Sequence, residues 1–99
     1  MNAPLPNATI AKLKSLAQRL EPVLVLGKLG VTDGFVRSLD EVLGLQELVK
    51  LKFGAFKEER KQLGPQLAAR TNSHLVWIVG HVAVFYRQQP DVAKRKVQV

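Results

Sequence analysis

A glycine-bracketed turn between an apolar run and an amphipathic segment constrains the fold of this chain more than any other feature. Residues 23–26 are all apolar, residues 27–30 read Gly-Lys-Leu-Gly, and helical periodicity begins at Phe35. That order predicts a strand, a tight turn and a helix. We call residues 27–30 the glycine turn.

The glycine turn is chemically suited to an anion. Gly27 and Gly30 permit backbone torsions that other residues avoid, and they leave nearby amides open to approach. A helix that starts at Thr32 or Asp33 presents unpaired N–H groups and a partial positive charge, and Lys28 adds a full charge. Such a corner fits a phosphate or a nucleic-acid backbone, although a plain structural connection explains the same residues equally well.

Hydrophobic periodicity assigns the other residues to short helices and strands. The predicted order is helix 8–20, strand 23–26, a helix from Thr32 or Asp33 to Leu43, strand 47–53, helix 57–71, and strands 75–79 and 82–87. Only Gly80-His81 separates the last two strands, which predicts a hairpin with glycine first in a mirror-type turn.

Several residues set the predicted boundaries. Asn7 is expected to cap the first helix and Pro22 to stop it, and Gly44 is expected to end the second helix in a left-handed cap. Gly64-Pro65 falls within the third helix, where a proline removes a hydrogen bond and clashes with the preceding turn at a cost of about 3 kcal/mol. We therefore expect that helix to be kinked or divided in two.

In the predicted strand at residues 47–53, apolar and basic side chains alternate. Val49, Leu51 and Phe53 share one face, and Lys50 and Lys52 share the other. We expect a half-buried strand with a basic outer face. An ordinary solvated surface explains the two lysines on that face as readily as a binding site does.

These elements predict an α/β (α+β) fold in a single domain. Each strand–helix–strand unit is expected to form a right-handed crossover with parallel strands, and the final hairpin adds an antiparallel strand. The result is one mixed four-stranded sheet with helices packed against it. The 99 residues suit one core, and we divide them into a flexible leader 1–8, a folded domain 9–88 and a flexible tail 89–99 with the basic run Lys94-Arg95-Lys96.

Charge indicates the class of partner. Fifteen Lys and Arg against eight Asp and Glu give a formal net charge of +7. For a chain this small, that excess favours a polyanion: nucleic acid first, and an acidic membrane surface or protein second. No apolar run approaches the ~18 residues of a membrane span, and the N-terminus does not resemble a signal peptide, so we expect a cytoplasmic protein without membrane contact.

The sequence offers no catalytic constellation. The chain has no cysteine, and its serines lie in no nucleophile-elbow context. His74 and His81 stand at opposite ends of one predicted strand, too far apart to share a metal, so we expect both to be turn residues. We expect neither an enzyme nor a cofactor, a metal or a small-molecule substrate.

Three segments together resemble a known family. Residues 16–34, which contain Leu-Glu-Pro-Val-Leu-Val-Leu-Gly-Lys-Leu-Gly-Val-Thr-Asp-Gly, resemble the opening of the CRM domain, the chloroplast RNA splicing and ribosome maturation module. Residues 47–52 resemble its second strand and residues 79–87 its hairpin, so the resemblance extends from about residue 10 to residue 87. The stand-alone bacterial form is usually called the YhbY family, and a lone domain of this length resembles that form.

The resemblance implies a single-domain, open-faced α/β sandwich similar to the C-terminal domain of bacterial translation initiation factor three. It implies RNA binding, with the glycine turn acting on a nucleic-acid backbone as the KH loop does, and a part in assembling the large ribosomal subunit by binding its precursor. The implied RNA-binding residues are Gly27, Lys28, Leu29 and Gly30 in the turn and Lys14, Arg19, Lys50, Lys52 and Arg87 beside it. The chain departs from the family pattern at Gly64-Pro65 and at Leu29, an apolar tip residue that could pack on a ribose or a base.

Two other hypotheses stay open at this point. The chain could be a protein-interaction module that docks on an acidic ribosomal or assembly protein. It could also be a small-anion or nucleotide-binding domain that uses the same turn. The sequence does not fix the oligomeric state, and a monomer is our working expectation.

Overall fold

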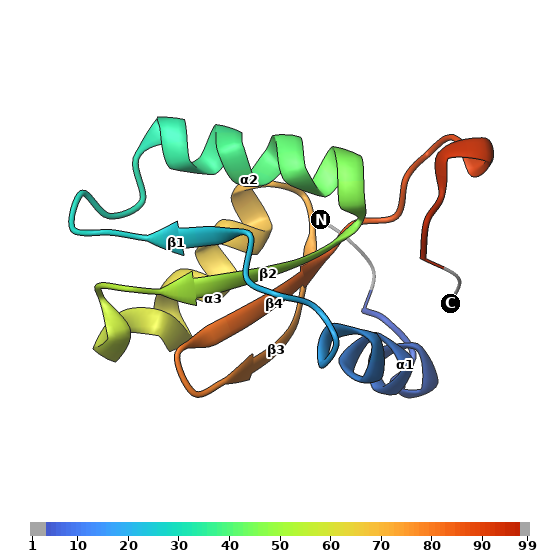
Figure 1. Ribbon diagram of the computed structural model, residues 1–99, viewed down its shortest axis with the longest axis horizontal. Coiled ribbons are helices and arrows are strands. Elements are labelled where there is room, and N and C mark those ends of the chain that lie inside the picture. The colour runs from blue at the N-terminus through green and yellow to red at the C-terminus, as the bar shows by residue number, and fades with distance from the viewer. Residues whose placement is uncertain (1–3, 98–99) are drawn as a thin grey trace.

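The computed structural model describes residues 4–97 and confirms the predicted order of elements (Figure 1). The helices are α1 (Asn7–Ala17), α2 (Asp33–Gln46) and α3 (Arg60–Arg70), and the strands are β1 (Leu24–Leu26), β2 (Leu48–Phe53), β3 (His74–Val79) and β4 (Val82–Tyr86). There are also two 3₁₀ turns: η1 (Lys57–Glu59), which leads into α3, and η2 (Val92–Lys94) near the C-terminus.

The four strands form one mixed sheet in the order β1-β2-β4-β3. β1 pairs with β2 in parallel, and β4 pairs antiparallel with both β2 and β3. β3 therefore runs in the same direction as β2, with β4 between them. The hairpin turn has Gly80 at a φ of +56° in its first position, as the Gly-His pair predicts. The predicted mixed four-stranded sheet is confirmed.

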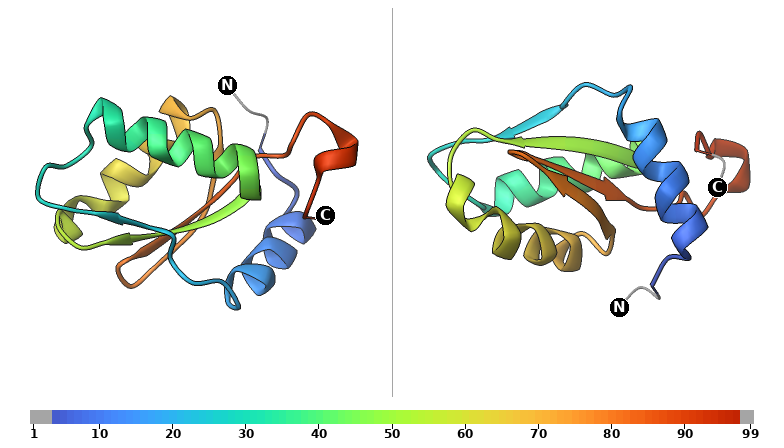
Figure 2. Two further views of the ribbon diagram at one scale, coloured as in Figure 1. Left: turned by 45° about the horizontal axis from the view of Figure 1, so that its top comes forward. Right: turned by 90° about the horizontal axis from the view of Figure 1, so that it is seen from below.

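Helices cover the two faces of the sheet unequally (Figure 2). α2 and α3 pack on one face, and α1 crosses one end of the opposite face. The larger core cluster, under α2 and α3, consists of Leu26, Leu39, Leu43, Val49, Leu51, Phe53, Leu67, Ala68, Ala83 and Phe85. The smaller cluster, under α1, consists of Leu13, Ala17, Leu48, Val84 and Tyr86. Each fully buried Leu or Phe stabilises the fold by about 1.5–3 kcal/mol, so the α2–α3 side supplies most of the hydrophobic stabilisation.

The ends of α1 and α2 differ from their predicted positions. Asn7 is the first residue of α1 and does not cap it, and α1 stops at Ala17, before a tight turn that reaches Leu20. Gly44 lies inside α2, and the chain turns only at Glu47, whose φ is +65°. Glutamate rarely adopts this left-handed torsion. Its buried carboxylate accepts three backbone N–H groups here, and these bonds offset the strain.

Gly64-Pro65 does not divide the third helix. α3 runs through both residues without a break, and the change of helix type comes at its start, where η1 leads into it. A Cβ atom at Gly64 would lie 3.1 Å from a methyl of Leu75 and 3.2 Å from a methyl of Ile78. Gly64 therefore lets α3 approach β3 closely, a packing role that the sequence pattern did not reveal.

The predicted flexible ends make specific contacts where the structure describes them. Residues 1–3 of the leader and 98–99 of the tail lie outside the described residues. Leu5 packs against the cluster under α1. The backbone N–H groups of Gln89, Lys96 and Val97 all donate to the carboxylate of Glu47. The described part of the tail thus contacts the domain at Glu47.

Candidate nucleic-acid interface

The glycine turn lies at the end of β1, away from α1 (Figure 1). The N–H of Gly30 donates to the carbonyl of Gly27 at 3.0 Å, which closes the turn. Lys28 and Leu29 form its exposed tip, and Leu29 keeps 90% of its surface accessible. Thr32 then caps α2 by accepting the N–H of Phe35 at 3.0 Å. The predicted strand, turn and helix are confirmed.

The two glycines of the turn have different structural roles. Gly30 has a φ of +74°, and a Cβ atom there would lie 3.3 Å from the ring of Phe56. Gly27 has no positive φ, and a Cβ atom there would meet no other atom within 4 Å. The stem of the turn is fixed because the carbonyl of Leu26 accepts the N–H groups of Gly54, at 3.0 Å, and Ala55, at 2.9 Å.

Substituting the two glycines separately should distinguish these roles. We expect Gly30→Ala to lower the free energy of unfolding by about 1–2 kcal/mol, because alanine is strained in the left-handed region. We expect Gly27→Ala, its matched control, to stay within about 0.5 kcal/mol of wild type. Urea denaturation followed by circular dichroism measures both values. Equal losses at the two positions would contradict this account of the turn.

Basic side chains follow the α1 side of the sheet away from the turn. Lys52 is exposed and pairs across the strands with Val25, two residues before Gly27. Lys50 lies on the same face, two residues farther from the turn, and its Nζ donates to the carbonyl of Leu20 at 3.1 Å. That bond holds the ammonium group beside the end of α1.

The same face continues onto α1. Arg19 is exposed in the turn that follows α1, and the Nζ of Lys14 lies 5.4 Å from the ring centroid of Trp77 on β3. We define the basic row as Lys14, Arg19, Lys28, Lys50 and Lys52. Within residues 4–97, no member of the row forms an ion pair with Asp or Glu. Their charges are therefore available to an external anion.

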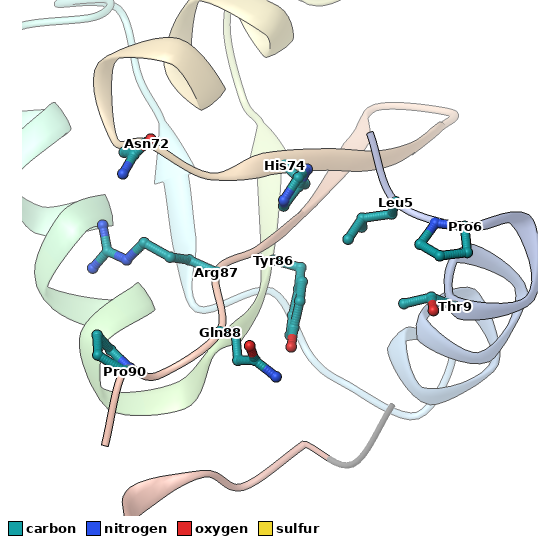
Figure 3. A pocket seen from close by; sticks show the side chains of 9 residues that line it. All are labelled: Leu5, Pro6, Thr9, Asn72, His74, Tyr86, Arg87, Gln88 and Pro90. Atoms are coloured by element: carbon teal, nitrogen blue, oxygen red, sulfur yellow. The ribbon is translucent and has the colours of Figure 1, made fainter. Parts of the chain in front are cut away.

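Arg87 lies apart from the basic row. Its side chain points away from Tyr86 and His74 (Figure 3), toward the α2–α3 side of the sheet. Its guanidinium pairs with the carboxylate of Asp40 at 2.5 Å and donates to the carbonyls of Asp40 at 2.9 Å and Thr71 at 2.7 Å. This arginine, which follows β4, is bonded to the middle of α2 and to the residue that caps the end of α3, so the structure does not group it with the other predicted site residues.

A family model supports the grouping of turn, sheet and helices into one known domain. The model of the CRS1 / YhbY (CRM) domain matches residues 5–87, most of the chain. This chain belongs to the CRM domain family. The resemblance seen in the sequence is confirmed.

The relatives of this CRM domain have names that refer to RNA. A probable RNA-binding protein of Pseudomonas aeruginosa is 35% identical over 84 residues, covering 84% of this chain and 81% of that protein. An RNA-binding protein of Haemophilus influenzae is 38% identical over 80 residues, covering 80% and 81%. The solution structure of a Staphylococcus aureus protein, described as a candidate RNA-binding protein, matches with a TM-score of 0.77 and 27% identity over 96% of this chain and 100% of that one.

Three residues of this CRM domain have positions beside the site that the sequence analysis did not assign to them. Phe56 backs the glycine turn from a left-handed conformation, with a φ of +55°. The ring of Trp77 lies under the ammonium group of Lys14, a cation–π contact, and it also packs against the cluster under α1. Lys96 is held near the domain through its backbone N–H. Only Trp77 had a sequence signal, since strand alternation places it on the α1 side, apart from a bulge between Leu75 and Trp77.

A hollow of about 480 Å³ separates α1 from the start of β3 (Figure 3). His74, the first residue of β3 and so not a turn residue, stacks on Tyr86 with ring centroids 6.5 Å apart. Burial lowers the pKa of His74 and raises that of Tyr86, which the charge of Glu47 raises further. Both rings are therefore uncharged at neutral pH, and the hollow does not add to the basic row.

Two other classes of site are absent from the part of the chain that the structure describes. No helix within residues 4–97 is long and apolar enough to cross a bilayer. The same residues contain no group of three or more His, Cys, Asp or Glu side chains that would hold a metal ion.

Proposed function

We propose that this protein is a non-catalytic, cytoplasmic RNA-binding protein that contacts ribosomal RNA in a precursor of the large subunit and assists its assembly. The observation that carries the proposal is the basic row, whose five cations lead from the glycine turn along the sheet to α1 and form no ion pair with Asp or Glu within residues 4–97. A series of such cations beside a tight turn suits the polyanionic backbone of a nucleic acid. The protein would act as a monomer.

Each part of the row has a distinct task in this proposal. Lys28 reaches a phosphate at the turn, where the absence of a side chain on Gly27 lets the backbone approach closely. Leu29, fully presented at the tip, packs on a ribose or a base. Lys52 and Lys50 bind phosphates along the sheet. Because Lys52 pairs with Val25, about 7 Å of extended strand separates Lys52 from Gly27 and about 13 Å separates Lys50 from it.

The RNA partner is supported by the relatives' names, and the ribosomal target by the family resemblance. The chain spans most of the length of the relatives in Pseudomonas aeruginosa and Haemophilus influenzae, 81% of each. Sucrose-gradient sedimentation of cell lysate tests the ribosomal target. We expect the protein to migrate with a large-subunit precursor at low salt and to leave it as salt rises. A protein that stays at the top of the gradient in both buffers would exclude this target.

The salt dependence of RNA binding tests the electrostatic mechanism. If roughly five phosphates are neutralised, the slope of log affinity against log salt should lie near −3 to −5. Lys28→Ala should make that slope shallower by about one unit, because one phosphate contact is lost. Fluorescence anisotropy with a labelled structured RNA, measured from low to moderate salt, gives both slopes. A slope near zero for wild type would exclude this mechanism.

A protein-interaction module is the second candidate. Val25 and Val79 keep 57% and 44% of their surfaces exposed on the face that carries Lys52, and such apolar surface beside cations also suits an acidic protein. Nuclease treatment before sedimentation separates the two functions. Association that survives the nuclease and tolerates Lys28→Glu would favour a protein partner.

A further inference from the structure

A groove lies where α1 ends, at the opposite end of the basic row from the glycine turn. Its volume is about 580 Å³, within the range of roughly 300–1,000 Å³ that is usual for small-ligand sites. The C-terminal segment forms one of its walls, since Lys96 and Val97 line it together with residues of α1, of the connection from α1 to β1, of the end of α2 and of β2. Figure 2 shows that segment returning toward α1.

The groove combines an apolar floor with a cationic rim. The floor residues are Leu16, Leu20, Val23, Leu48 and Val97. Arg19, Lys50 and Lys96 are its cations, against the single carboxylate of Glu21. Within residues 4–97 none of the three cations is paired with Asp or Glu. The site therefore has a net positive charge above a surface that favours a flat apolar group.

The wall formed by the C-terminal segment is fixed by a buried carboxylate. Glu47 is only 1% exposed, and it accepts the N–H groups of Gln89 at 2.9 Å, Val97 at 3.0 Å and Lys96. The Nε of Arg95 also donates to the carbonyl of Gln89 at 2.8 Å, which braces the segment on itself. These bonds place the side chain of Lys96 across the groove from α1 before any ligand arrives.

We propose that this groove binds one unpaired nucleotide of the RNA, with its base on the apolar floor and its phosphates between Arg19, Lys50 and Lys96. The inference rests on the proposed function and extends it. RNA on the basic row would then be held at both ends, by the glycine turn and by the groove. Gln46, at the rim, offers both a donor and an acceptor to a base edge.

Charge and position favour a nucleotide over other occupants. An acidic peptide would form ion pairs with the cations, but its carboxylates would leave no flat apolar group to pack on the floor. Lys50 belongs both to the row and to the groove, so a strand that follows the row reaches the groove without a gap. Single-stranded nucleic acid is commonly bound where cations lie beside aromatic side chains on which the bases stack; in this groove the aliphatic side chains of the floor take the place of the aromatic rings.

Two RNA probes test the inference: one hairpin with a blunt end, and the same hairpin with about six unpaired nucleotides at its 3′ end. We expect the extension to strengthen wild-type binding about 25-fold. At about 0.1 M salt the phosphate contact of Lys96, the one groove cation outside the basic row, is worth roughly fivefold, and the base on the apolar floor adds roughly another fivefold. An extension that lacks bases should give a smaller gain. Equal gains from the abasic and complete extensions would overturn the placement of the base on the floor.

A single substitution locates the effect. Lys96→Gln removes the one groove cation that lies outside the basic row, so it should reduce the gain from the extension about fivefold while leaving blunt-hairpin affinity unchanged. Lys57→Gln, at an exposed position of η1, is the matched control and should retain the full gain. An undiminished gain in the Lys96 variant would overturn the inference. Wild-type protein that binds the blunt hairpin without any gain from the extension would overturn it too and leave the proposed function standing, whereas failure to bind either RNA would overturn the proposed function itself.

Discussion

Reversing the charges of Lys28 and Lys52 together should weaken binding to structured RNA about 100-fold. Each reversal removes a phosphate contact worth roughly fivefold to eightfold at about 0.1 M salt, and it adds repulsion between a carboxylate and the RNA. Both side chains are exposed and neither forms an ion pair within residues 4–97. The free energy of unfolding should therefore change by no more than about 0.5 kcal/mol.

The matched control for this variant lies on the other side of the molecule. Lys57 and Lys61 are also exposed lysines, on η1 and α3, and reversing both gives the same change in net charge. If affinity depended on net charge alone, the two double variants would lose it equally. Anisotropy titrations at a fixed salt concentration make the comparison, and equal losses would rule out the basic row as the binding surface.

Replacing the buried carboxylate of Glu47 should strongly destabilise the fold. Glu47→Gln keeps the size of the side chain but removes the charge that three backbone N–H groups share. We expect a loss of about 2 kcal/mol in the free energy of unfolding. We also expect exchange-protected amides at Lys96 and Val97 to become unprotected, as measured by NMR hydrogen exchange. Glu58→Gln, at an exposed position, should change neither quantity.

The pH dependence of that loss follows from the pKa of Glu47. Burial alone would raise the pKa, but the N–H donors from Gln89, Lys96 and Val97 and the charge of Arg95 outweigh it, so the pKa lies below its ordinary value of 4.5. The ionised group therefore stabilises the fold fully above about pH 4.5 and loses this effect as pH falls through the lower, folded-state pKa. The stability difference between wild type and Glu47→Gln should shrink in the same interval. A difference that does not change with pH would show that charge is not the cause.

Local patterns predicted the elements that hold the candidate site. The apolar run before Gly27, the cap at Thr32 and the alternation of lysines with apolar residues on β2 each depend on neighbours in sequence, and all three appear in the structure. The turn and the exposure of Lys52 were predictable for the same reason. Lys50 was placed on the correct face, but its bond to the carbonyl of Leu20 joins residues 30 apart and has no local signature.

Residues whose role depends on distant partners were not predictable in this way. Gly44 was expected to end α2, but the chain reverses its direction only at Glu47. Both residues are bonded to Gln89 of the C-terminal segment, which lies more than 40 residues away from them in sequence. Arg87 was grouped with the RNA-binding residues by family resemblance alone, while strand alternation from Phe85 and Tyr86 already directed it toward the α2–α3 side. Its partner Asp40 lies 47 residues away.

The position of β4 between β2 and β3 has a consequence for the newly made chain. β2 and β3 are synthesised before β4, and in the sheet they do not pair with each other, because β4 lies between them. Until residues 82–86 emerge from the ribosome, β2 has a partner only on its β1 side, and the leucines of α3 have no complete sheet to cover. Closure of the core is therefore delayed until the last of the four strands has been made.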